Sequence, residues 1–241
     1  MDFLISRSAL ALAILAAGVS CKQQAKASSS NSGFLSHKSE GGSREPAALD
    51  FRPEEQFKTS AGRTLVMKFR SAQSELPKAK DQLLLFARCG SPETNGPERL
   101  ERVKDSESWP DDCLEMYVFL LDGFRQIRLM QIVPNSESGD WYEQQDFLFG
   151  PEGKLRYWER YFGSFNPDEP TKSWHAFAWS DNGSAIDHAT QFLDPEGRPW
   201  NGREPKAPPR PPLSLRTLLD QLKLTRPLQA TKVNVPAKVI P

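Results

Sequence analysis

The sequence predicts an α+β protein in which an antiparallel β-meander of about six to seven strands packs against one or two short helices. Three observations lead to this fold class. Apolar and polar residues alternate over roughly 80 residues after Cys113. Turn sequences containing Asp, Asn, Pro and Gly interrupt that alternation at short intervals. Near the C-terminus, leucines recur at helical spacing. Because a twisted meander of this size curves readily, the sheet is expected to curl towards a half-barrel.

Before Cys113 the pattern is less regular. The segment Thr64–Arg70 is rich in apolar and β-branched residues and predicts a strand. In the next segment, Pro77–Arg88, apolar residues recur at helical spacing and Gly90 follows as a stop signal. We therefore expect a helix with one apolar face there, followed by a loop with one short helix near Arg99–Lys104.

The meander itself is predicted from strands separated by recognisable turns. Asp122–Gly123 and Asn182–Gly183 are hairpin dipeptides, and Pro151 and Gly153 suit a four-residue turn. Pro134 lacks the N–H that a central ladder needs, so it is expected to end a strand. The predicted strands are Met116–Leu121, Arg125–Val133, Trp141–Phe149, Leu155–Phe162, Trp174–Ser180 and Ala185–Leu193.

The C-terminal part begins with a proline-rich segment. Pro205–Pro212 is expected to adopt an extended polyproline II conformation and to act as a spacer. The leucines from Leu215 to Leu222 then form the apolar stripe of a short helix, with Ser214 as candidate N-cap. This helix is expected to dock on the sheet, with binding of a partner as the alternative. Residues after Pro227 are expected to form a loose tail.

The N-terminus has the features of an export signal. Arg7 precedes the apolar run Ala9–Val19, which is too short to span a bilayer as a stable helix. Small residues lie directly before Cys21, and this arrangement resembles the lipobox of bacterial lipoproteins. In that family the thiol is acylated, for example with palmitate, and becomes the new N-terminus once the leader is cut. The resemblance implies a membrane anchor at Cys21, and Lys22 in place of Asp implies the outer membrane rather than the inner.

A plain secretory signal is the alternative. Cleavage near Ser20 would leave Cys21 as a free thiol, and cleavage after Ala25 or Ala27 would remove it. The polar, Ser- and Gly-rich segment that follows cannot bury enough apolar surface to fold, so it is expected to be a flexible linker. The predicted organisation is a signal peptide at 1–20, a lipidated Cys and linker at 21–48, a β-rich globular domain at 49–204, and a Pro-rich spacer, helix and tail at 205–241.

The charge balance and the cysteine content argue against several classes of function for this protein. The chain has 31 basic and 31 acidic residues, and this balance argues against a nucleic-acid-binding protein. If Cys21 is acylated, Cys89 and Cys113 are left as a pair in an oxidising compartment, where a disulfide is favoured over two free thiols. No C-x-x-C pair is present and the three histidines are scattered, so we predict no metal site and no cofactor.

One face of the meander collects side chains that could contact a ligand. Alternation along the strands gathers aromatic, basic and histidine side chains that could stack on sugars or hold an anionic group. The alternative is an aromatic face that packs on helices. The residues of this possible ligand surface are Trp158, Arg160, His175, Trp179 and His188.

The function that these observations favour is a non-catalytic cell-envelope lipoprotein. Its domain would lie in the periplasm or on the cell surface and present a sheet surface to an envelope protein or cell-wall polymer. One alternative is a carbohydrate- or peptidoglycan-binding module, which requires Trp158 or Trp179 to be exposed. The other is a hydrolase in which His175 or His188 pairs with a nearby carboxylate such as Asp181, Asp187 or Glu159.

Overall fold

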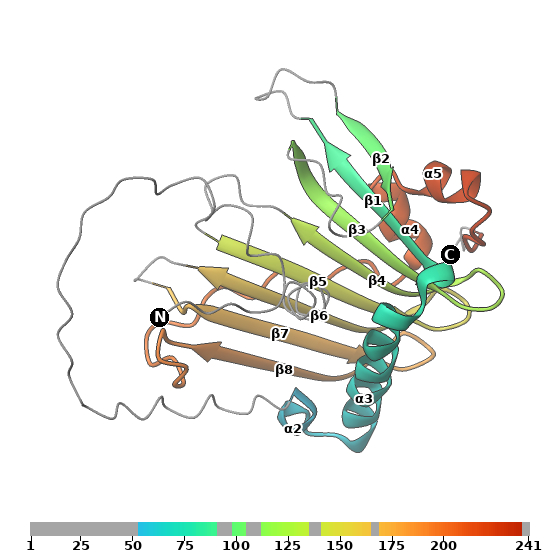
Figure 1. Ribbon diagram of the computed structural model, residues 1–241. Helices are drawn as coiled ribbons and strands as arrows, with labels where there is room; N and C mark the ends of the chain where they lie inside the picture. The colour runs from blue at the N-terminus through green and yellow to red at the C-terminus, as the bar shows by residue number, and fades with distance from the viewer. Residues whose placement is uncertain (1–52, 91–97, 105–111, 135–140, 165–168, 238–241) are drawn as a thin grey trace, which may run out of the picture.

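The computed structural model describes residues 53–90, 98–104, 112–134, 141–164 and 169–237 (Figure 1). The predictions for the signal peptide at 1–20, for Cys21 and for the linker at 21–48 lie outside these residues.

The core of the fold is one open, twisted antiparallel sheet of eight strands in the order β2-β1-β3-β4-β5-β6-β7-β8 (Figure 1). From β3 to β8 each strand pairs with the next along the chain, which confirms the predicted meander. The strands are β1 (Leu83–Cys89), β2 (Arg99–Val103), β3 (Cys113–Leu121), β4 (Ile127–Pro134), β5 (Trp141–Phe149), β6 (Leu155–Ser164), β7 (Lys172–Trp179) and β8 (Ala185–Leu193). The fold is therefore mainly β with a few short helices, and the strand number exceeds the predicted six to seven.

The predicted strand at Thr64–Arg70 is wrong, because this segment lies inside helix α3 (Ser60–Glu75), which follows the short helix α2 (Pro53–Gln56). The Oγ1 atom of Thr59 accepts the backbone N–H of Gly62 at 3.0 Å and caps the first turn of α3. The buried residues that follow recur at helical spacing and form one apolar face, namely Leu65, Val66, Phe69 and Ala72. Seven residues were too few to distinguish this spacing from that of a strand.

The predicted helix at Pro77–Arg88 is also wrong. Two single 3-10 turns, Leu76–Lys78 and Lys80–Gln82, lead directly into strand β1. Since helices cover both faces of the sheet, the strand can bury consecutive apolar residues, and its continuous Leu-Leu-Leu-Phe run reflects this. The short helix expected near Arg99–Lys104 is instead strand β2, which pairs with β1.

Each face of the sheet carries its own hydrophobic core. On one face α3 packs its apolar side against β4, β6, β7 and β8, and the ring of Phe69 stacks on Tyr157 at 4.9 Å between centroids. On the other face the leucines of α4 (Leu215–Gln221) and α5 (Thr225–Ala230) cover residues from β1, β3 and β4. Figure 1 shows α3 and the pair α4–α5 on opposite sides of the sheet.

The C-terminal segment is only partly as predicted. Helix α4 is present and docks on the sheet, although Ser214 makes no side-chain capping bond. The loose tail expected after Pro227 is wrong, because α5 continues to Ala230 and the side chain of Val233 is buried. The N–H of Asn234 then donates to the carbonyl of Arg125 at 2.9 Å, which ties this segment to the turn between β3 and β4. Within the described ranges, no helix has both the length and the apolar character needed to cross a lipid bilayer.

Candidate functional site

The predicted ligand surface lies on the face of the sheet that α4 and α5 also cover. The strand register aligns Trp158, Phe177 and His188 across β6, β7 and β8, and the ring of Phe177 stacks on each of the other two at 5.7 Å. Arg160 pairs in the same way with His175. The structure therefore gathers these residues on one face, as alternation along the strands implies.

Most of this surface is covered. Trp158 and Trp179 are 1% and 2% exposed, so neither presents the open ring that sugar stacking requires. Part of the cover is the proline-rich segment, because Pro208–Pro212 line a groove together with Trp158, and Arg210 places its guanidinium 4.8 Å from the ring centroid of Phe177. The segment predicted as a spacer thus packs on the sheet.

The chain on both sides of this segment is hydrogen-bonded to the sheet. Before it, the backbone N–H of Trp200 donates to the carbonyl of Phe192 at 2.9 Å. After it, the carbonyl of Leu213 accepts from the N–H of Leu155 at 2.9 Å. The proline-rich segment therefore crosses from the outer strand β8 to the beginning of β6.

A groove of about 410 Å³ remains between β4–β6, α4 and the proline-rich segment. This volume lies in the range of small-ligand sites, which are mainly apolar with a few placed polar groups. Its lining has this composition and consists of Ile132, Glu143, Gln145, Phe147, Trp158, Arg160, Pro208, Pro209, Arg210, Pro211, Pro212, Leu218 and Leu222.

The polar part of the groove is one connected set of side chains. Arg160 donates to both carboxylate oxygens of Glu143, from Nε at 2.9 Å and from Nη2 at 2.7 Å. Gln145 donates to the same carboxylate at 2.8 Å and accepts from the indole N–H of Trp158 at 3.3 Å. Glu143 and Arg160 therefore form an internally neutral ion pair within mainly apolar walls, and Arg210 adds a guanidinium that lies over the ring of Phe177.

His175 is 2% exposed, and its Nδ1 atom has no hydrogen-bond partner among the described residues. Burial, together with the nearby charge of Arg160, lowers the pKa of His175 to about 4, so the imidazole is neutral at pH 7. Its proposed partner Glu159 lies on the other face of β6, because it directly precedes Arg160. No ion pair joins either His175 or His188 to a carboxylate in the part of the chain that the structure describes.

A second polar cluster lies beneath α3. Arg70 of α3 donates to both oxygens of Glu159 at 2.7 Å, and Glu159 is completely buried. The Tyr157 hydroxyl and the Trp174 indole N–H donate to the same carboxylate at 2.7 and 3.1 Å. Burial and the negative charge of Glu159 raise the pKa of Tyr157. These contacts attach α3 to the sheet at a polar point within an apolar core.

Asp146 lies opposite Glu159 in the ladder between β5 and β6, and it is also completely buried. Its two oxygens accept from the side-chain amides of Gln131 and Gln144 at 2.6 and 2.7 Å. Burial, with a further contribution from the charge of Glu159, raises the pKa of Asp146 to about 7. Since both carboxyl groups are inaccessible, the cluster is a structural element rather than a site for substrate.

Sequence reasoning did not single out Asp146, Gln131 or Gln144. The available signal was a carboxylate directly before the apolar end of a strand, Phe147–Phe149. A carboxylate at such a position either lies at the surface or is buried with hydrogen-bond partners. Only the packing of α3 on this face of the sheet decides between these two environments.

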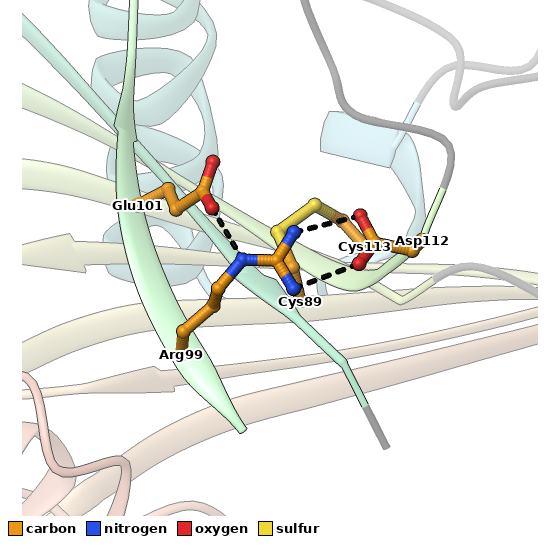
Figure 2. The surroundings of a disulfide bond; sticks show 5 residues. All are labelled: Cys89, Arg99, Glu101, Asp112 and Cys113. Atoms are coloured by element: carbon orange, nitrogen blue, oxygen red, sulfur yellow. Dashed lines mark hydrogen bonds and ion pairs between the residues drawn. A yellow bond between two sulfur atoms is a disulfide. The ribbon is translucent and has the colours of Figure 1, made fainter. Parts of the chain in front are cut away.

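The predicted disulfide between Cys89 and Cys113 is present and joins β1 to β3, which are neighbouring strands (Figure 2). Figure 2 shows the Arg99 guanidinium beside it, paired with Glu101 and with both oxygens of Asp112. The hydrogen bonds from Arg99 lower the pKa of Asp112. Asp112 and the two sulfur atoms lie close enough together to resemble a metal site, but the sulfur atoms are bonded to each other and the carboxylate is paired.

Comparison with known proteins gave no match to a family model, to a curated protein or to a solved structure.

Proposed function

We propose that this chain is a lipid-anchored protein of a bacterial cell envelope and that its folded domain is a non-catalytic binding module. The anchor would be an acyl group on Cys21, and the domain would lie in the periplasm or on the cell surface, with the outer membrane as the favoured membrane. In this proposal the open sheet is a half-barrel that supports the binding surface.

The observation that carries the binding function is the groove of about 410 Å³ beside the proline-rich segment. Its walls are mainly apolar, Glu143 and Arg160 neutralise each other, and Arg210 adds one positive charge. A surface of this kind suits an extended segment of an envelope component that brings apolar side chains and few charges. The buried rings of Trp158 and Trp179 favour this partner over a sugar polymer.

The disulfide supports the proposed location. A disulfide persists in oxidising compartments and is rare in the cytosol. Cys89 and Cys113 bond to each other, which leaves Cys21 as the one cysteine available for acylation.

The anchor is tested by growth of an expressing bacterium with radiolabelled palmitate, followed by membrane fractionation. We expect label in the wild-type chain and in a Ser30→Ala control, but none in Cys21→Ser, which should leave the membrane fraction. Unlabelled wild-type protein, or identical fractionation of Cys21→Ser, would refute the anchor.

The groove is tested with a photo-crosslinking residue placed at Pro209 or at Leu222, both of which line it. The matched control places the same residue at Met67, which is 64% exposed on α3. We expect one discrete crosslinked species from the two groove positions in intact cells and none from Met67. The same pattern from all three positions would argue against a specific binding groove.

A further inference from the structure

The turn between β3 and β4 holds an aromatic ring out into solvent. Phe124 is 78% exposed, more than Met67 or Leu213, the other exposed large apolar residues among those described. The turn is well ordered by hydrogen bonds, because Oδ1 of Asp122 accepts the backbone N–H groups of Phe124 and Gln126 at 2.8 Å. The ring is therefore presented by a defined turn rather than by an irregular loop.

This turn forms one unit with the segment that follows α5. The side chain of Arg125 donates to the carbonyls of Thr231 and Lys232 at 2.9 and 3.0 Å. In return, the side-chain amide of Asn234 donates to the carbonyl of Phe124 at 2.8 Å. Figure 1 shows the segment that follows α5 next to the turn that joins β3 to β4, and Asn234 forms a β-bridge with Gln126 there. Phe124 thus has a fixed position relative to α5.

The same unit is rich in positive charge. After Asp220 the sequence carries Lys223, Arg226 and Lys232 within the described residues, and it has no Asp or Glu. These three side chains are exposed. Lys223 lies 3.9 Å from a carboxylate oxygen of Glu98, whereas Arg226 and Lys232 have no ion pair among the described residues. The guanidinium of Arg125 bonds to neutral carbonyls, and Asp122 is the one carboxylate in the turn, so the described residues of this unit keep a positive excess.

We propose that this edge of the domain, formed by the β3–β4 turn and α5, docks on a membrane surface that contains anionic lipids. The ring of Phe124 enters the headgroup region, and Arg125, Arg226 and Lys232 contact lipid phosphates. Exposed apolar side chains such as Phe enter the boundary between headgroups and acyl chains, and exposed basic residues are attracted to anionic headgroups. A single projecting ring gives far less contact than the roughly 800 Å² that each partner contributes to a stable protein interface.

This contact is independent of the groove and of lipidation. If Cys21 is acylated, the two attachments reinforce each other, because the anchor keeps the domain close to the membrane. The experiment therefore uses residues 21–241 with Cys21→Ser, the chain left after the proposed cleavage, so that no acyl group contributes.

The measurement is co-sedimentation with vesicles of phosphatidylcholine alone or with phosphatidylglycerol. We expect binding to the phosphatidylglycerol vesicles only, reduced on the order of tenfold in Arg226→Gln/Lys232→Gln. The matched control, Lys58→Gln/Lys68→Gln, removes two exposed charges elsewhere and should bind as the parent does. A Phe124→Trp reporter should shift its fluorescence to the blue on binding and be quenched by brominated lipid, whereas Met67→Trp should not.

Two results would overturn the proposal. One is equal sedimentation of the two double variants, which would show attraction by overall charge rather than by this edge. The other is a Phe124→Trp spectrum that does not change when the protein binds, which would show that the ring stays in water. Failure of palmitate labelling would leave this proposal intact, since it concerns only Cys21.

Discussion

Replacement of Asp146 by Asn should make the free energy of unfolding depend on pH in a range where that of the wild-type chain is nearly constant. The pKa of Asp146 in the folded state is about 7, against roughly 3.9 for an unfolded Asp. Between these values the folded state holds a proton that the unfolded state has lost, so the free energy of unfolding falls as pH rises. The slope is about 1.4 kcal/mol per pH unit, and the total is about 4 kcal/mol.

His175 acts in the opposite direction over nearly the same range. Its pKa in the folded state is about 4, against roughly 6.5 when unfolded. Between these values the unfolded state binds the extra proton, so the free energy of unfolding rises with pH by about 1.4 kcal/mol per unit. In the wild-type chain the two contributions nearly cancel from about pH 4 to pH 6.5, and a net loss of stability remains only as pH approaches 7.

The assay is urea unfolding at several pH values between 4.5 and 8. Asp146→Asn should gain stability with rising pH up to about 6.5, because the contribution of His175 is then no longer offset by that of Asp146. His175→Gln should lose stability with rising pH up to about pH 7. The slope is the readout, since a constant packing cost of either substitution does not change it. A constant difference between Asp146→Asn and wild type across this range would refute the reasoning.

The variant Asp187→Asn is the control for this unfolding experiment. Partial burial acts to raise its pKa, but hydrogen bonds, first from the backbone N–H of Thr59, outweigh this and lower it. Its contribution to stability is therefore complete above the ordinary carboxyl range and is lost only as pH falls. Asp187→Asn should show the same slope as wild type between pH 5 and pH 8.

Three further changes test the packing of the domain by urea unfolding. Arg70→Met should lower the free energy of unfolding by about 3–5 kcal/mol, because it leaves the buried carboxylate of Glu159 without its ion-pair partner. The double variant Arg70→Met/Glu159→Gln should recover much of this loss. Absence of recovery would show that the ion pair is not the cause. Cys89→Ala/Cys113→Ala should cost about 3 kcal/mol and make stability insensitive to reductant; a reductant effect that persists would contradict the assignment. Thr59→Ala should cost about 1 kcal/mol through loss of the cap on α3, and an unchanged midpoint would show that the cap contributes little.

The meander could be predicted from the sequence because its determinants are local. Alternation over Trp141–Phe149 and Ala185–Leu193 gives the bounds of β5 and β8 as the structure has them. Two of the turn glycines adopt the left-handed conformation that their turns require, with φ of 71° at Gly153 and 84° at Gly183. In the turn between β3 and β4 the left-handed residue is Arg125, with φ of 59°, rather than the predicted Gly123. The cysteine pair followed from counting and compartment alone.

The candidate site could be predicted only in part. Alternation places Trp158 and Arg160 on one face, but whether that face is open depends on the proline-rich segment that crosses it. The buried pair of Asp146 and Glu159 depends in the same way on α3, which supplies Arg70 from a distant part of the chain. Neither contact leaves a periodic signal in the strands themselves.

The sequence by itself determined the strands from β3 to β8 and the turns at Gly153 and Gly183, because each depends on neighbouring residues and on the two-residue period of a strand. The cysteines that bond followed from their number. Only the tertiary structure decided that Thr64–Arg70 is helical and that the leucine run of β1 is a strand. Short apolar runs satisfy both periods, and the surface against which they pack selects between them.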